Sequence, residues 1–165
     1  MENETPHYSL PNEEAEKNRT SWDTYFIDIT NLVKERSTCN RAKVGAILVK
    51  NRRIISTGYN GASRGTKHCS EVGCNVIKAG ENPENLRDHC SRTVHAEQNA
   101  IIQAALFGVG VEGATLYCTH TPCYTCAKMI ANAGVKEVIY MKNYDDKDSL
   151  SLLEEAGIKL REYES

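Results

Sequence analysis

Two short motifs constrain the fold of this 165-residue chain more strongly than any other part of its sequence. One is His95-Ala96-Glu97, and the other is Pro122-Cys123-Tyr124-Thr125-Cys126. Each motif stands at the start of a predicted helix. Pro122 suits a first helical turn, because the N–H that proline lacks would have no partner within the helix there. If the two motifs act together, the chain must bring two helix N-termini side by side.

The side chains of both motifs are suited to bind zinc. A helix N-terminus carries a partial positive charge and unpaired N–H groups, which favour the thiolate form of Cys123 and Cys126 that binds metal. These cysteines are three positions apart and share a helical face, and His95 provides a third ligand. Three protein ligands leave the fourth position of tetrahedral zinc to water, which is the arrangement of a catalytic site.

Glu97 gives such a site an acid–base group. Bound zinc lowers the pKa of its water from about 15.7 to about 7, so hydroxide is present at neutral pH. We expect Glu97 to carry the water proton to N3 of a cytosine ring while hydroxide attacks C4, and then to protonate the amine that leaves as ammonia. H-x-E followed by P-C-x-x-C is the signature of zinc nucleobase deaminases. A redox pair or half a zinc ribbon at Cys123 and Cys126 would leave His95 and Glu97 without a role.

The rest of the pattern predicts alternating strands and helices. Ser21 caps a helix whose apolar stripe is Trp22, Tyr25, Phe26, Ile29, Leu32 and Val33. Residues 44–57 predict a hairpin that turns at 50–52, and residues 114–141 predict a βαβ unit. A helix over 149–156 and a strand over 158–160 follow, whereas residues 62–92 are predicted to be irregular. The alternation indicates an α/β fold with helices on both faces of a sheet.

Composition narrows the class of protein. The length fits a single domain, residues 20–165, after a flexible acidic segment, residues 1–19. The net charge is -2 and no basic cluster stands out, which argues against a nucleic-acid partner. No run approaches the ~20 apolar residues that span a bilayer, and the polar start is unlike a signal peptide. We therefore expect a cytoplasmic protein without a membrane partner, in which the seven cysteines bind metal rather than form disulfides.

Beyond the zinc motifs, the sequence resembles the deoxycytidylate (dCMP) deaminases of the zinc-dependent cytidine deaminase superfamily. The resemblance covers about Ser21 to Tyr140 and rests on the following stretches: residues 43–46 (KVGA), 54–61 (IISTGYNG), 95–101 (HAEQNAI), 113–117 (GATLY) and 122–128 (PCYTCAK). It implies a three-layer α/β/α fold with a mixed five-stranded sheet and the conversion of dCMP to dUMP for thymidylate synthesis. It also implies a homo-oligomer, often a hexamer, with activation by dCTP, inhibition by dTTP and Mg²⁺ accompanying the triphosphate.

The resemblance also suggests which residues hold the substrate. Asn60 matches an asparagine that contacts the sugar, although Asn-Gly is equally a turn signal. The main chain near Ala96 and Thr121 would border the pyrimidine. Phosphate needs a cation, and Arg41, Lys43 and Arg64 are the nearby candidates, although each can also be a solvated surface charge.

A second, structural zinc is the remaining expectation. Cys39, Cys69 and His89 match ligands of a structural zinc in some family members, with Cys74 or Cys90 as the fourth. Four protein ligands would close such a site and order residues 62–92. The alternative is a set of partly buried thiols. Two rival functions also remain: a polynucleotide deaminase, which would need a basic groove with aromatic platforms, and a zinc-scaffolded binding module, in which Glu97 would have no role.

Overall fold

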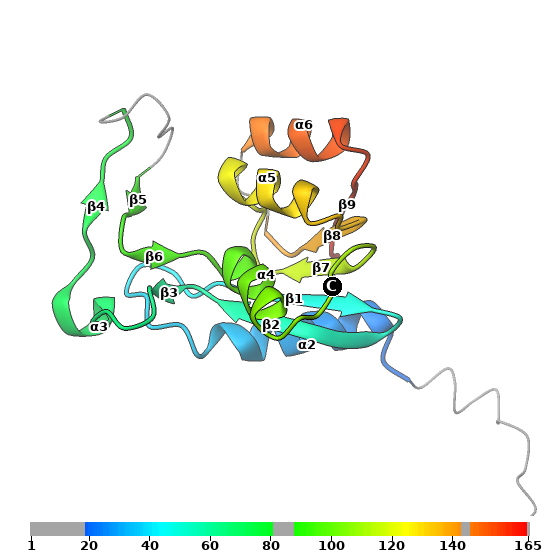
Figure 1. Ribbon diagram of the computed structural model, residues 1–165, viewed down its shortest axis with the longest axis horizontal. Helices are drawn as coiled ribbons and strands as arrows, with labels where there is room; N and C mark the ends of the chain where they lie inside the picture. Colours follow the sequence, from blue (N-terminus) through cyan, green and yellow to red (C-terminus); the bar gives the residue numbers. More distant parts are fainter. Residues whose placement is uncertain (1–18, 81–87, 143–145, 165) are drawn as a thin grey trace, which may run out of the picture.

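The computed structural model describes residues 19–80, 88–142 and 146–164. Its centre is a five-stranded sheet in the order β2-β1-β7-β8-β9 (Figure 1). β1 is antiparallel to both β2 and β7, whereas β7, β8 and β9 run parallel. The expected mixed five-stranded sheet is therefore confirmed. The segment expected to be flexible, residues 1–19, lies outside the described residues except for Arg19.

Most predicted elements coincide with an observed one, with shifted ends. The strands of the sheet are β1 (Gly45–Lys50), β2 (Arg53–Tyr59), β7 (Thr115–Cys118), β8 (Glu137–Tyr140) and β9 (Lys159–Glu162). The longer helices are α2 (Trp22–Lys34), α4 (Ala96–Leu106), α5 (Tyr124–Asn132) and α6 (Lys147–Glu155). The β1–β2 hairpin turns at Asn51 and Arg52, whose φ angles of 51° and 59° suit a two-residue turn that follows the twist of the strands.

Helices cover both faces of the sheet, which confirms the three-layer prediction. On one face, α2 packs through Phe26 and Ile27 against Ile47, Tyr117 and Ile139. On the other face lie α4, α5 and α6 (Figure 1). Their buried contacts with the sheet include Ala100, Leu116, Ile130, Val138 and Leu153. The parallel strands β7 and β8 are largely apolar because they are buried on both sides, whereas β9, at the edge of the sheet, is mostly polar.

The buried face of α2 differs from the predicted stripe. Leu32 is 72% exposed and Tyr25 47% exposed, whereas Ile27 and Thr30, outside the stripe, are buried. The Thr30 hydroxyl donates to the carbonyl of Phe26 at 2.7 Å, so a polar side chain can occupy the buried face at little cost. The helix exists where predicted, but its apolar residues are too numerous for the pattern to fix its rotation.

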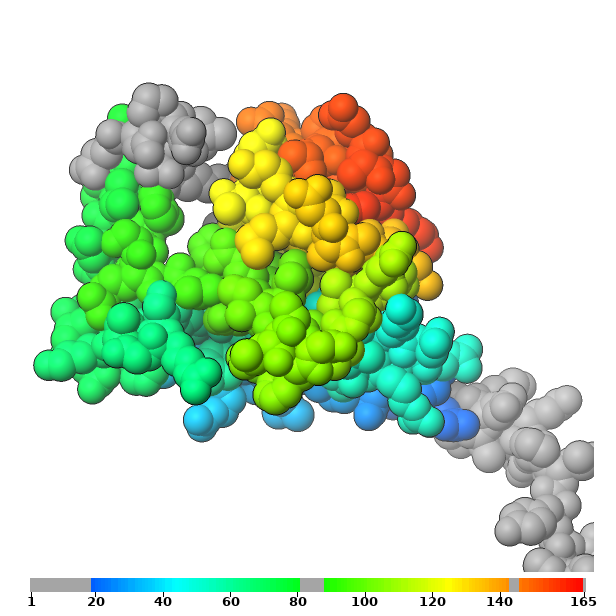
Figure 2. All heavy atoms as spheres, viewed as in Figure 1, coloured from blue at the N-terminus to red at the C-terminus, as the bar shows by residue number. Residues whose placement is uncertain are grey.

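The described residues of the segment 62–92 contain more regular structure than predicted. They contain α3 (Cys69–Val72) and the short strands β4 (Val76–Ile77) and β5 (His89–Cys90), and β3 (Gly61–Ala62) pairs with β6 (Thr93–Val94). β4 and β5 pair with each other and form an arm beside the sheet. In Figure 2 a gap separates this arm from α5. Because the arm projects from the body, a local cross-link at its base would stabilise it.

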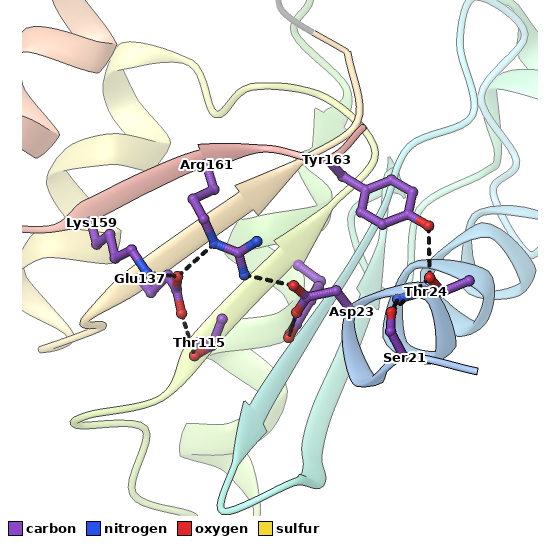
Figure 3. A network of polar contacts seen from close by, with 9 residues as sticks. Ser21, Asp23, Thr24, Thr115, Glu137, Lys159, Arg161 and Tyr163 are labelled. Atoms are coloured by element: carbon purple, nitrogen blue, oxygen red, sulfur yellow. Dashed lines mark hydrogen bonds and ion pairs between the residues drawn. The ribbon is translucent and has the colours of Figure 1, made fainter. Parts of the chain in front are cut away.

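A polar network joins the beginning of α2 to the last strand (Figure 3). Arg161 on β9 contacts Asp23 at 2.8 Å and Glu137 at 3.0 Å, and the buried hydroxyl of Tyr117 donates to Asp23 at 2.7 Å. Burial raises the pKa of the Asp23 and Glu137 carboxyls, but the hydrogen bonds to these groups outweigh it and lower both pKa values overall. Within the described residues, no helix has the length and apolar character needed to cross a membrane.

Candidate active site and metal centres

His95, Cys123 and Cys126 converge at the N-termini of two neighbouring helices. His95 is the N-cap residue of α4, and Cys123 is the N-cap residue of α5. Nδ1 of His95 lies 3.3 Å from Sγ of Cys123 and 3.4 Å from Sγ of Cys126. In tetrahedral zinc with ordinary Zn–S and Zn–N bonds, two such ligand atoms stand about 3.6 Å apart. The three side chains therefore fit one zinc ion, with Nδ1 as the nitrogen ligand.

The charges at this site also suit a metal cation. A hydrogen bond from Cys126 stabilises the Cys123 thiolate, and with the nearby His95 it outweighs burial and lowers the pKa of Cys123 to about 4. The same bond raises the pKa of Cys126, because the second thiol must ionise beside the first. The hydrogen bond with Cys123 raises the pKa of His95 to about 9. A bound zinc ion would replace the protons that these hydrogen bonds share, and its charge would balance both thiolates.

Glu97 lies beside the three ligands. It is 3% exposed, and its Oε2 is 3.8 Å from Sγ of Cys126. Burial raises its pKa, although the positive charge of His95 opposes the change. A carboxyl group whose charged form is destabilised by burial can both take up and release a proton, as an acid–base catalyst must.

The sheet sets the position of α4. Gly58 on β2 packs so closely under α4 that a Cβ atom there would overlap the backbone of Ala96 and Ala100. Two further contacts hold the same surfaces together: the Ser56 hydroxyl donates to the carbonyl of Ala100 at 2.6 Å, and the Asn99 amide donates to the carbonyl of Tyr59 at 2.7 Å. Because Gly58 has no side chain, α4 can approach β2 closely, and this approach sets the positions of His95 and Glu97.

A cavity of about 290 Å³ opens onto His95 and Cys123. Its described lining includes Glu97, Asn60, Ala96 and Thr121, as expected, and also Arg41 and His120. Of the three cations suggested by the sequence, Arg41 lines this cavity, whereas Lys43 and Arg64 line other cavities. Lys43 pairs with Glu35 at 2.6 Å, and Arg64 faces a groove between β2 and α4.

A second group of ligand atoms lies at the base of the arm. The sulfur atoms of Cys69, Cys74 and Cys90 all lie within 4.8 Å of one another, and those of Cys69 and Cys90 are 3.9 Å apart. Two thiolates on one tetrahedral zinc stand about 3.8 Å apart, whereas a disulfide requires about 2.05 Å. Cys90, the alternative ligand, thus stands with Cys69 and Cys74, whereas Cys39 and His89 lie outside this group and line the main cavity.

Comparisons with known proteins agree with this arrangement. A family profile described as the cytidine and deoxycytidylate deaminase zinc-binding region matches residues 20–142. The chain belongs to this family. ComE operon protein 2 of Bacillus subtilis is 43% identical over 88% of the chain and 73% of its own length. The deoxycytidylate deaminase of Schizosaccharomyces pombe is 42% identical over 88% of the chain, which spans only 45% of that longer protein.

A solved structure extends the family relationship to the whole fold. It is the dCMP deaminase of the cyanophage S-TIM5 in complex with dCMP and dUMP, which is 31% identical to the chain. The superposition covers 93% of this chain and 100% of the phage protein, with a TM-score of 0.69. The mixed sheet with helices on both faces is therefore the fold of this deaminase family.

Asn60, which lines the cavity, is also held by three side-chain hydrogen bonds within the protein. Its side-chain oxygen accepts hydrogen bonds from the Ser37 hydroxyl at 2.6 Å and from the N–H of Val44 at 2.8 Å, and its Nδ2 donates to the carbonyl of Ala42 at 2.8 Å. Asn60 therefore fixes the loop that carries Arg41 along the cavity wall. Nδ2 carries a second hydrogen, which leaves one donor for a substrate.

Sequence reasoning missed several residues that shape the site. Ser149, near the start of α6, is fully buried and its hydroxyl donates to the carbonyl of Pro122 at 2.6 Å. Ser37 supports Asn60, and Gly58 allows the close approach of α4. A glycine inside a predicted strand is a recognised sign of close backbone approach, so Gly58 carried a signal. The two serines carried none, because their partners lie far away in the sequence.

Proposed function

We propose that this chain deaminates dCMP to dUMP and ammonia with the help of zinc. The observation that carries the proposal is the buried Glu97 carboxyl beside His95, Cys123 and Cys126 at the floor of a cavity. Deoxycytidylate deaminase is the printed name of several relatives, and the cyanophage relative was solved with dCMP and dUMP. Family membership and the site therefore support the same reaction.

In the proposed mechanism, His95, Cys123 and Cys126 would hold the zinc ion, which would supply an activated water at neutral pH. Glu97 takes one proton of the attacking water and delivers it to N3 of the cytosine ring, while the water oxygen bonds to C4. Glu97 then transfers the other proton to the amine at C4. The C4–N bond breaks, ammonia leaves and the carbonyl of uracil forms, so the two protons of the water end on N3 and on ammonia.

The residues that line the cavity suit the base, the sugar and the phosphate of the nucleotide. The main chain at Ala96 and Thr121 borders the base, and the remaining donor of Asn60 suits a sugar hydroxyl. Among the described residues lining this cavity, Arg41 is the one with a permanent positive charge. A guanidinium fork pairs well with phosphate oxygens, so we assign the substrate phosphate to Arg41. Arg41→Gln should raise KM for dCMP and leave KM for deoxycytidine unchanged.

Glu97→Gln tests the chemistry directly. The change keeps the shape of the side chain but removes its acid–base function, so kcat for dCMP should fall by at least about 10²-fold while the zinc content remains at the wild-type value. Glu112→Gln, on an exposed residue, is the matched control. A Glu97→Gln variant with wild-type activity, or a zinc-loaded wild-type chain inactive on dCMP, CMP, dCTP and deoxycytidine alike, would rule out the mechanism.

We further propose a structural zinc bound by Cys69, Cys74 and Cys90. It would fasten the β4–β5 arm to the body at the cavity wall. Elemental analysis should give two zinc ions per wild-type chain and one per Cys74→Ser chain. The same measurement on Cys39→Ser shows whether Cys39 is the fourth ligand, as its place on the neighbouring wall allows. One zinc per wild-type chain would remove the second site.

Regulation and assembly rest on the family resemblance. We propose a cytoplasmic homohexamer of single-domain subunits, activated by dCTP and inhibited by dTTP, with Mg²⁺ accompanying the triphosphate. Light scattering during size-exclusion chromatography measures the oligomer mass. Rates for dCMP with each triphosphate, with and without Mg²⁺, measure the control. Rates that neither triphosphate changes would contradict the allosteric part alone.

A further inference from the structure

A further cavity of about 220 Å³ shares a wall with the catalytic cavity. It is lined by three lysines from separate parts of the chain: Lys34 at the end of α2, Lys43 before β1, and Lys142 after β8. It therefore opens at the carboxyl ends of the parallel strands β7 and β8, the edge at which α/β sheets bind ligands. Ala42 and His120 line this cavity and the catalytic cavity alike.

The charges lining this lysine cavity are poorly balanced. Lys43 pairs with Glu35 at 2.6 Å. Within the described part of the chain, Lys34 and Lys142 form no ion pair, and no acidic residue lines the cavity. Three ammonium groups around one cavity repel one another unless an anion lies between them.

Helix electrostatics explain only one of the three lysines. Lys34 ends α2, where the helix dipole favours a cation, and its ammonium donates to the side-chain oxygen of Asn31 at 2.7 Å. That bond directs Lys34 along the cavity wall, because Asn31 also contacts Met141 at 3.3 Å. Nothing in α2 accounts for Lys142, which approaches from the other side.

The positive potential reaches the wall shared with the active site. Burial lowers the pKa of the His120 imidazole, and the charges of Lys142 and Lys34 lower it further. Nδ1 of His120 is 2.9 Å from the hydroxyl of Thr119, which lines the lysine cavity. The carbonyl of Lys142 accepts hydrogen bonds from the N–H and the hydroxyl of Thr121, a residue of the catalytic cavity.

We propose that the lysine cavity binds a phosphate group of a nucleotide, at a site distinct from the catalytic cavity. Phosphate matches the chemistry of the lining, because ammonium groups bind phosphate as point charges and three of the described lining residues are lysines. The shared wall then lets the anion affect deamination. Binding itself is independent of the proposed function, whereas its effect on the rate rests on it.

Calorimetry on the zinc-loaded full chain tests this site with inorganic phosphate and tripolyphosphate at fixed ionic strength. The double variant Lys34→Gln/Lys142→Gln should bind tripolyphosphate roughly tenfold more weakly than wild type. Lys67→Gln/Lys136→Gln removes the same charge from exposed positions and should bind like wild type. Lys142→Gln alone serves if the double variant does not fold. Equal affinity in all these proteins, or no binding by wild type, would overturn the proposal without bearing on deamination.

Kinetics of the same variants identify the source of the phosphate. If it belongs to a second anion, the double variant keeps the wild-type KM for dCMP and the response of the rate to tripolyphosphate disappears, which supports the proposal. If it belongs to dCMP in the active site, the double variant raises KM for dCMP and leaves KM for deoxycytidine unchanged, and the lysine cavity is then not a distinct site.

Discussion

Gly58→Ala should loosen the metal centre although the residue touches no ligand. The added Cβ would stand 3.0 Å from Cα of Ala100 and closer still to the carbonyl oxygen of Ala96. Ordinary carbon contacts lie at about 3.5–4.0 Å, so α4 must move away from β2 by roughly 0.5–1 Å. The neighbouring atoms belong to helix backbone and cannot turn aside as a flexible side chain would.

This displacement has two measurable consequences. Overpacking of this kind costs about 1–3 kcal/mol of unfolding free energy, and the rigid backbone contact places Gly58→Ala in the upper part of that range. His95 moves with α4, whereas Cys123 and Cys126 stay with α5. Because metal–ligand distances tolerate only about 0.2 Å, zinc affinity should fall by at least about tenfold.

Urea unfolding gives the stability, and competition with a chromogenic chelator gives the zinc affinity. Gly110→Ala is the matched control, because a Cβ there has no heavy atom within 4 Å. A Gly58→Ala protein with the midpoint and zinc affinity of the Gly110→Ala protein would refute the argument that β2 sets the position of α4.

Three further predictions follow from the contacts described above. Because folding lowers the pKa values of Asp23 and Glu137, the unfolded chain takes up protons on these carboxylates before the folded chain does as pH falls below about 4.5. The free energy of unfolding should therefore decline in this range, and it should decline less steeply in Arg161→Gln. Urea midpoints with equal pH dependence in both proteins would contradict this. Ser149→Ala should cost about 1–2 kcal/mol in unfolding free energy, whereas exposed Ser151→Ala should cost almost nothing; equal costs would exclude the buried bond. Removal of zinc with a chelator should lower the thermal midpoint seen by calorimetry, and added zinc should restore it; an unchanged midpoint would show that the ions do not stabilise the fold.

The catalytic group was predictable because its signals are local. His95 and Cys123 stand at helix starts that Pro122 and the following helix-forming residues mark in the sequence. The spacing between Cys123 and Cys126 then places both thiols on one face. The turn of the first hairpin could also be predicted, because Asn tolerates the positive φ that Asn51 adopts.

The other site residues were harder to predict, because residues close together in the sequence lie in different sites. Arg41 and Lys43 are two positions apart in one loop, yet they line different cavities, because Asn60 fixes the path of that loop. His89 and Cys90 are adjacent in an extended strand, where successive side chains point in opposite directions. Spacing alone could not show whether His89 or Cys90 lies with Cys69 and Cys74.

The tie between α2 and β9 has a consequence for synthesis of the chain. Asp23 leaves the ribosome 138 residues before its partner Arg161. Until then the hydroxyl of Tyr117 and the carboxyl of Asp23 share a contact that lacks its balancing cation. The nascent polypeptide can therefore form its first hairpin early, but it completes the contact between α2 and the far edge of the sheet only after β9 has been synthesised.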